Sequence, residues 1–152
     1  MKTKNKFKEA VEATPDISGC YQDGSKAVKE KNIIIVQNKR NLEGSVDIDT
    51  CTTKKYPQEN RWDYVVGYKD HAFYIEVHGA KDSEVTTLIK KLEWLKDWKA
   101  RSESLSKIPS SYHWVFTKGY EISPRSKYPH LIAQAGLRPP VKILDFDSFL
   151  QE

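Results

Sequence analysis

Two carboxylates mark the stretch WDYVVGYKDHAFYIEVHGA, residues 62–80, because each belongs to a run of β-branched and aromatic residues. Asp63 opens the first run and Glu76 lies near the end of the second, with twelve residues between them. Burying a carboxylate in an apolar strand is unfavourable unless the charge is paired or binds a cation. Two carboxylates and a main-chain carbonyl, that of Val77, supply the oxygen ligands that Mg²⁺ or Mn²⁺ prefers. We therefore expect a metal site.

His78 belongs to the same expected site. Side chains alternate along a strand, so His78 shares the strand face of Glu76. A neutral His78 could act as a general base, a protonated one would be a cation, and a third role is metal ligand. Asp47 and Asp49 on the preceding predicted strand could add a ligand.

Each of these residues also has a purely structural interpretation. Asp63 could cap a turn, Glu76 could pair with a lysine across the sheet, and His78 could be an exposed residue at a strand end. It is the combination of the three within one apolar hairpin that favours a metal site.

The two acids can meet only if two strands run side by side. Residues 62–68 and 72–78 predict strands, and the short link KDH makes them antiparallel neighbours, so the start of one lies beside the end of the other. Residues 82–100 predict an amphipathic helix with an apolar stripe at positions 85, 88, 89, 92 and 95, its lysines lying largely off the stripe. Trp94 and Trp98 fall on a flanking face.

The remaining pattern predicts further elements around this hairpin. We expect a helix over residues 15–30 capped by Thr14, strands over 32–36, 45–51, 112–117 and 141–146, a loop over 38–44, and a helix over 128–135 closed by Gly136. The predicted fold class is α/β, a mixed central β-sheet flanked by helices, in a single domain over residues 1–152.

Composition bounds the kind of protein. The chain has 152 residues, of which 38% are hydrophobic and 30% charged, as in an ordinary globular domain. No apolar run is long enough for a membrane span and no apolar segment follows the basic N-terminus, so we expect a cytoplasmic protein without a membrane partner. Cys20 and Cys51 lack partners at zinc-like spacing, and we expect them to be buried free thiols.

The net charge of +4 is mild, but the basic residues are clustered. Clusters of this kind can follow a phosphate backbone, although charge alone fits solvated surface better. The candidate nucleic-acid-binding residues are Lys26, Lys39, Arg40, Lys54, Lys55 and Lys81.

The stretch from Asp63 to His78 resembles the catalytic core of the PD-(D/E)XK nuclease superfamily, in which an Asp opens one strand and Glu-X-Lys ends the next. Here the second half reads Glu76-Val77-His78, with histidine in place of the usual lysine, and Trp62 stands where the family name has proline. The resemblance implies a restriction-endonuclease-like core in the order α-β-β-β-α-β over residues 14–152, preceded by a basic segment over 1–13. Lys81 or Lys26 could replace the missing lysine, as migrated lysines do in some members.

The resemblance also implies a function. It predicts a nuclease that cleaves phosphodiester bonds of DNA with Mg²⁺ or Mn²⁺, in which Asp63, Glu76 and His78 are catalytic and Asp63, Glu76 and Val77 bind the metal; a homodimer or larger complex would be in keeping with the family. The alternative is an inactive nuclease-like fold that binds nucleic acid or protein. In a further alternative without nucleic acid, Trp94 and Trp98 form a protein-contact surface.

Overall fold

The computed structural model describes residues 4–152, so Lys2 of the basic N-terminal segment lies outside the described residues. The helices are α1 (Lys6–Glu12), α2 (Ile48–Thr52), α3 (Val85–Ala100), α4 (Glu103–Ser106), α5 (Tyr128–Gln134) and α6 (Phe146–Leu150), with 3₁₀ turns η1 (Pro15–Ile17), η2 (Lys39–Asn41) and η3 (Asp82–Glu84). The strands are β1 (Ile34–Ile35), β2 (Leu42–Asp47), β3 (Tyr64–Tyr68), β4 (His71–Val77), β5 (Ala80–Lys81), β6 (Ser110–Val115), β7 (Tyr120–Glu121) and β8 (Leu144–Asp145).

The central sheet has the strand order β2-β3-β4-β6. The strands β2, β3 and β4 are antiparallel neighbours, whereas β4 and β6 are parallel. Lys69 and Asp70 both have positive φ, 49° and 60°, which is the backbone of the tight turn that joins twisted antiparallel strands. The predicted mixed sheet and the hairpin within it are confirmed.

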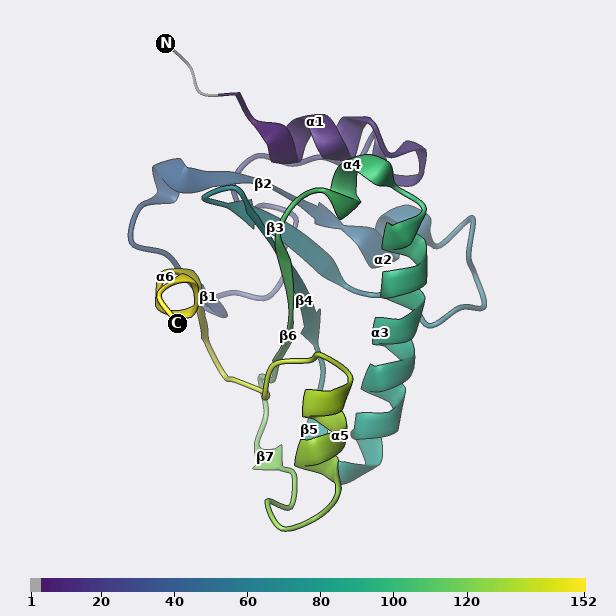
Figure 1. Cartoon of the computed structure of the whole chain (residues 1–152), viewed down its shortest axis with the longest axis vertical. Helices are drawn as coiled ribbons and strands as arrows, with labels where there is room; N and C mark the ends of the chain where they lie inside the picture. The colour runs from purple at the N-terminus through teal and green to yellow at the C-terminus, as the bar shows by residue number, and fades with distance from the viewer. Residues whose placement is uncertain (1–3) are drawn as a thin grey trace.

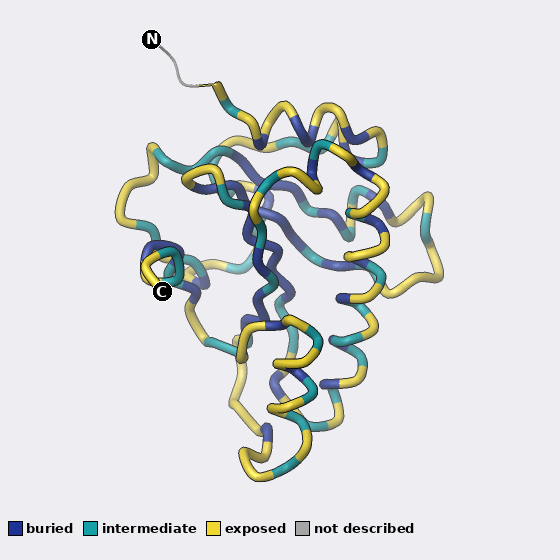
Figure 2. The backbone as a smooth tube through the Cα atoms, viewed as in Figure 1, coloured by how far each residue is buried: buried dark blue, intermediate teal, exposed yellow. Residues whose placement is uncertain are grey.

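Helices cover both faces of this sheet, and Figure 1 shows α3 running beside the central strands. One face packs Val65, Tyr74 and Trp114 against α1, α3 and α5. The opposite face packs Val66, Phe73 and neighbouring residues against Ile33, Leu144 and Phe146 around the parallel pair β1–β8 and α6. The strands in the middle of Figure 2 are accordingly buried, while exposed residues lie on the outer helices and loops.

The basic N-terminal segment forms α1 and contributes to the core. Asn5 caps this helix by accepting from the N–H of Lys8, and Phe7 and Val11 are buried. Phe7 lies against Gly67 of β3, where an added Cβ would come within 2.5 Å of the Phe7 ring. The sheet is therefore covered by a helix at residues 6–12, and this helix takes the place expected for the one at 15–30.

The helix predicted over residues 15–30 is wrong beyond its first turn. Pro15–Ile17 forms only a 3₁₀ turn, and Gly24 has φ +55°, which a right-handed helix does not accommodate. The segment instead lies along β2, where Gln22 and Ser45 exchange backbone hydrogen bonds of 2.9 and 2.8 Å.

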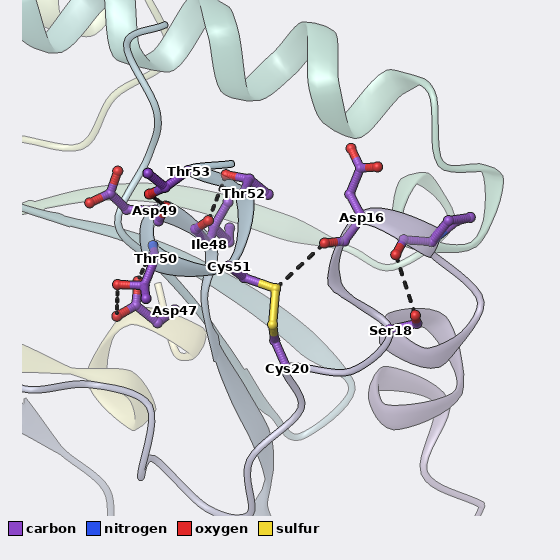
Figure 3. The surroundings of a disulfide bond; sticks show 11 residues. Asp16, Ser18, Cys20, Asp47, Ile48, Asp49, Thr50, Cys51, Thr52 and Thr53 are labelled. Carbon is purple, nitrogen blue, oxygen red and sulfur yellow. Dashed lines mark hydrogen bonds between the residues drawn. A yellow bond between two sulfur atoms is a disulfide. The ribbon is translucent and has the colours of Figure 1, made fainter. Parts of the chain in front are cut away.

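The cysteines are not free thiols. Cys20 and Cys51 form a disulfide with Cα atoms 6.3 Å apart, which joins the irregular segment to α2 (Figure 3). The prediction of free thiols fails because the pairing depends on the path of residues 18–22 beside α2, which spacing alone does not reveal.

Residues 45–51 are also not one strand. β2 ends at Asp47, whose side chain accepts from the N–H of Thr50 and so caps α2. Val46 and Ile48 are both fully buried, which produced the alternation that suggested a continued strand. The predicted loop over 38–44 contains η2 and the start of β2.

The later elements follow the prediction more closely. α3 is confirmed, as is α5, which ends before Gly136 at φ +84°. The predicted strand 112–117 corresponds to β6. The predicted strand 141–146 is only the pair Leu144–Asp145, because Asp145 caps α6 by accepting from the N–H of Ser148.

Candidate functional site

Asp63 and Glu76 lie at the same end of the β3–β4 hairpin and fix each other through the backbone. The N–H of Asp63 donates to Oε1 of Glu76 at 3.0 Å, and the N–H of Val77 donates to Oδ2 of Asp63 at 3.0 Å. These reciprocal bonds hold both carboxylates at the point where β3 begins and β4 ends. The predicted meeting of the two acids is thus found in the structure.

Strand alternation decides which face the acids occupy. Tyr74 packs on the face covered by α3, and Glu76, two residues later, lies on the same face and is fully buried. There Lys91 of α3 donates from Nζ to Oε2 of Glu76 at 2.6 Å. The buried carboxylate of Glu76 is therefore paired with a lysine from the helix that covers this face of the sheet.

The contact keeps Lys91 charged. Burial would lower the pKa of Lys91, but the charge of Glu76 and the hydrogen bond to it outweigh burial, so that the pKa is raised. The side chain of Lys91 is only 20% exposed. The site thus holds a fixed positive charge next to its buried carboxylate.

His78 lies between two carboxylates. Its Nδ1 is 3.6 Å from Oε2 of Glu76, and its Nε2 is 2.8 Å from Oε2 of Glu84. The nearby carboxylate of Glu76 raises the pKa of His78; burial opposes this rise, and the hydrogen bond to Glu84 adds to it. Trp114 of β6 fixes the backbone here by donating to the carbonyl of His78 at 3.0 Å. Of the roles predicted for His78, this geometry favours the protonated, cationic one.

The N-terminus of α2 supports Asp63 from the other side. The N–H groups of Ile48 and Asp49 point to the carbonyl of Asp63 at 2.8 and 3.4 Å. Asp49 accepts from Nε of Arg61 at 2.8 Å. The negative charge of Asp49 contributes to the raised pKa of both Asp63 and Lys91. Asp47 is occupied elsewhere, by Lys29 at 3.1 Å and by its capping bonds. Of the two extra ligand candidates, only Asp49 faces the site.

The donor atoms suit a hard divalent cation. Burial raises the pKa of Asp63 to about 7 and the nearby charge of Glu76 adds to the rise, so the two carboxylates repel each other where they meet. The Oδ1 atom of Asp63 makes no hydrogen bond within residues 4–152. In enzymes that act on phosphate esters, Mg²⁺ is usually bound by one or two carboxylates, and water and substrate oxygens complete its coordination. These residues therefore fit Mg²⁺ or Mn²⁺.

A closed metal site built by the protein alone is not found. Within residues 4–152, no group of three or more His, Cys, Asp or Glu side chains is placed to hold a metal ion. The N–H of Val77 binds Asp63, and the metal-binding role of the Val77 carbonyl stays a prediction.

Only one of the six predicted phosphate-binding residues borders the site. Lys81 lines a pocket with His78. Lys26 lines a separate groove of about 850 Å³ with Lys8 and Lys29.

The other four predicted residues lie elsewhere. Lys39 and Arg40 of η2 precede Leu42, which pairs with Tyr68 at the end of the hairpin away from Asp63. Lys54 is exposed in the turn after α2, and Lys55 is paired with Asp16 at 2.6 Å.

Lys91 is the residue of the candidate site that the sequence analysis missed, because it placed the lysines of this helix largely off the apolar stripe. Leu88, Lys91, Leu92 and Leu95 follow the spacing i, i+3, i+4, i+7 of one helical face. A single lysine on an otherwise buried stripe points to a buried acid opposite. Trp98, by contrast, is 3% exposed and donates to Asp16, while Trp94 stacks on it, so this pair packs the helix and is not a surface patch.

Comparison with protein-family models, curated proteins and solved structures finds no match for this chain. Within residues 4–152, none of the helices has the length and apolar character that crossing a membrane would require.

Proposed function

We propose that the chain is a metal-dependent nuclease of the PD-(D/E)XK type. The observation that carries the proposal is the convergence of Asp63, Glu76 and Lys91 at one end of the hairpin. The order α1-β2-β3-β4-α3-β6 around a mixed sheet supports a restriction-endonuclease-like core. In this assignment α1 is the first helix of the core.

Each residue then has a defined task. Asp63 and Glu76 would hold Mg²⁺ or Mn²⁺, which when bound would lower the pKa of a water molecule and withdraw charge from the phosphate oxygens. Lys91 places an ammonium group beside Glu76, from where it would stabilise the negative charge that develops on the phosphate as the phosphodiester bond is attacked. Cationic His78 adds a second positive group on the same face, and Glu84 orients its ring. DNA stays the predicted substrate.

A nuclease-like fold without catalysis is the second candidate. One observation favours it: the Lys91–Glu76 contact satisfies the buried acid by itself, as a structural ion pair would. Such a protein would bind nucleic acid or another protein through the same surface. The two candidates differ in whether the carboxylate pair binds a divalent ion.

Cleavage and metal binding test the proposal together. Purified protein is incubated with single-stranded, duplex and branched DNA and RNA in Mg²⁺ or Mn²⁺, and Mn²⁺ binding is measured by electron paramagnetic resonance. We expect cleavage and binding by the wild type and neither by Asp63→Ala. Metal binding without cleavage of any of these substrates would support the metal site and contradict the nuclease. Absence of both metal binding and cleavage would favour the non-catalytic module.

A cytoplasmic location stays a prediction from the sequence. Disulfides persist mainly in oxidising compartments. In the cytoplasm the Cys20–Cys51 bond would therefore face reduction, which makes the redox state of the purified protein a variable to control in the assay.

A further inference from the structure

A small pocket opens beside the candidate site, at the carboxyl ends of β4 and β6. It has a volume of about 360 Å³ and is lined by Val77, His78, Gly79, Lys81, Glu84, Thr117 and Lys118. It therefore shares His78 with the site and adds two lysines from separate parts of the chain. Figure 1 shows β5 and β7, which flank this region, below the central sheet.

Two of the groups that could bind an anion in this pocket, Lys118 and the hydroxyl of Thr117, have no hydrogen-bond or ion-pair partner within residues 4–152. Both residues are exposed. The position of a Cβ on Gly79 would have no atom within 4 Å, so the backbone there borders open space. A phosphate group could approach Lys118 and the hydroxyl without displacing a side chain.

The acids around the pocket are already paired. Glu84 is bound by His78 at 2.8 Å, and Glu121 lies 3.7 Å from Lys81. Asp82 accepts from the N–H and the hydroxyl of Ser123 at 2.9 and 2.8 Å. These contacts reduce the repulsion that an incoming phosphate would meet.

The same contacts hold the loop after β6 in place. Asp82 ties Ser123 to η3, Ile122 is 3% exposed, and β7 pairs with β5 in the register Ala80–Tyr120 and Lys81–Glu121. The loop that carries Lys118 is thus anchored on both sides of β7 before any ligand binds. A preformed site of this kind binds with less loss of conformational entropy.

Tyr120 adds an exposed aromatic ring to this region. It is 49% exposed and is the one aromatic side chain among the large exposed hydrophobic residues within 4–152. The strand partner of Tyr120 is Ala80, which lies between Gly79 and Lys81 of the pocket. The ring of Phe116 packs against the ring of Tyr120, with the ring centroids 5.6 Å apart. An exposed, supported ring two residues from Lys118 is the arrangement that binds unpaired bases by stacking.

We propose that Lys118 and Tyr120 bind an unpaired nucleotide next to the cleaved bond, with its phosphate in the pocket and its base on Tyr120. This inference rests on the proposed nuclease function and specifies its substrate as DNA with a single-stranded segment at the cleavage site. A base within an intact duplex has no free face for Tyr120, so the subsite discriminates between paired and unpaired strands.

The test compares binding of two DNAs to the full chain by fluorescence anisotropy in EDTA, which prevents cleavage. One DNA is a blunt duplex and the other is the same duplex with a short single-stranded overhang. We expect the wild type to bind the overhang DNA roughly tenfold more tightly, the order expected for one base stacked on an aromatic side chain. Tyr120→Ala should lose this preference and Tyr120→Phe should keep it.

The lysine arm uses a charge-matched control. Lys118→Ala should weaken binding of both DNAs and lower the slope of log affinity against log salt by about 0.7 to 0.9, the value of one phosphate contact. Lys107→Ala removes the same charge from the end of α4, away from β5 and β7, and should change neither.

The outcomes separate the two levels of the proposal. Absence of binding to both DNAs by the wild type would overturn the subsite, whereas the nuclease itself is overturned only by absence of cleavage with Mg²⁺ or Mn²⁺ present. Binding of both DNAs with equal affinity, an unchanged preference in Tyr120→Ala, or an unchanged salt slope in Lys118→Ala would overturn the subsite alone and leave the nuclease standing. Since all three substituted side chains are exposed, circular dichroism of each variant should match the wild type.

Discussion

Lys91 of α3 and Glu76 of β4 are joined by a hydrogen bond of 2.6 Å in which the carboxylate side chain has no exposure to solvent. The contact ties the long helix to the strand end where Asp63 also lies. Stability and proposed function therefore meet in one pair of residues, and they can be separated by substitution.

Replacing Lys91 by methionine should destabilise the fold by roughly 3 kcal/mol, because Glu76 would stay buried without its partner. The free energy of unfolding from urea titration measures this. Lys90→Met, on the exposed side of the same helix, is the control and should be nearly neutral. The double variant Lys91→Met/Glu76→Gln should be more stable than Lys91→Met, because it no longer buries an unpaired charge. An equal loss of unfolding free energy in the two variants would deny the ion pair a stabilising role.

Divalent metal should partly replace the missing ammonium group in Lys91→Met. An ion between Asp63 and Glu76 binds the folded state only, and at about 100 times its Kd it would stabilise that state by about 2.7 kcal/mol. Thermal unfolding with and without Mg²⁺ is the measurement. Asp63→Asn should abolish the stabilisation. A Tm that does not change with Mg²⁺ in either Lys91→Met or the wild type contradicts the metal site.

Reduction of the Cys20–Cys51 bond should lower the free energy of unfolding by about 3 to 4 kcal/mol, the loop-closure value for the 31-residue separation. Chemical denaturation with and without dithiothreitol measures the difference. The Cys20→Ser/Cys51→Ser variant should have the same free energy of unfolding as the reduced wild type, and dithiothreitol should not change it. Titration of thiols in unfolded, unreduced protein should find none; two free thiols would contradict the bond.

The fold should lose stability as the pH falls below about 6.5, because of His113. Burial lowers the pKa of His113 to about 3, with smaller contributions from the charges of His71 and Arg138. Between these two values the unfolded chain binds a proton that the folded chain does not, so stability present above pH 6.5 falls by about 1.4 kcal/mol per pH unit. His113→Gln should flatten this dependence in urea titrations from pH 7 to 5. An equal slope in both proteins would exclude His113 as its source.

Gly67→Ala should destabilise the protein by about 1 to 3 kcal/mol through overpacking. The new methyl group would meet the ring of Phe7, whose Cγ lies 2.5 Å from the position that a Cβ at residue 67 would take, so the helix α1 must shift. Gly19→Ala, where a Cβ meets no atom within 4 Å, is the matched control and should have little effect. Equal Tm values for the two variants would show that α1 yields without penalty.

The hairpin could be predicted from sequence because its causes are local. Alternating apolar residues and a short polar link define both strands, and the link supplies Lys69 and Asp70 for the turn. The position of Asp63 beside Glu76 then follows from geometry. The partner of Glu76 could not be predicted in this way, because it depends on how α3 packs on the sheet. The position of Lys91 beside the apolar stripe of the helix was the one indication in the sequence.

The stretch from Thr14 to Thr52 was less predictable, because long-range contacts override its local pattern. Gly24 adopts a left-handed conformation, Cys20 bonds to Cys51, and the backbone at Gln22 pairs with Ser45. The end of β2 was readable in part: Asp47 with Thr50 three residues later is a helix N-cap, but the buried Ile48 resembled the next residue of a strand.

The helix α1 sets where a shortened version of the protein can begin. A fragment trimmed to residue 14, at the end of what reads as a basic tail, would remove Phe7 and Val11 and bare the apolar face of β3 around Gly67. Such a face, next to exposed strand backbone, invites association between molecules. Asn5 both caps α1 and donates to the carbonyl of Glu43, so a fragment designed for expression should start before this residue.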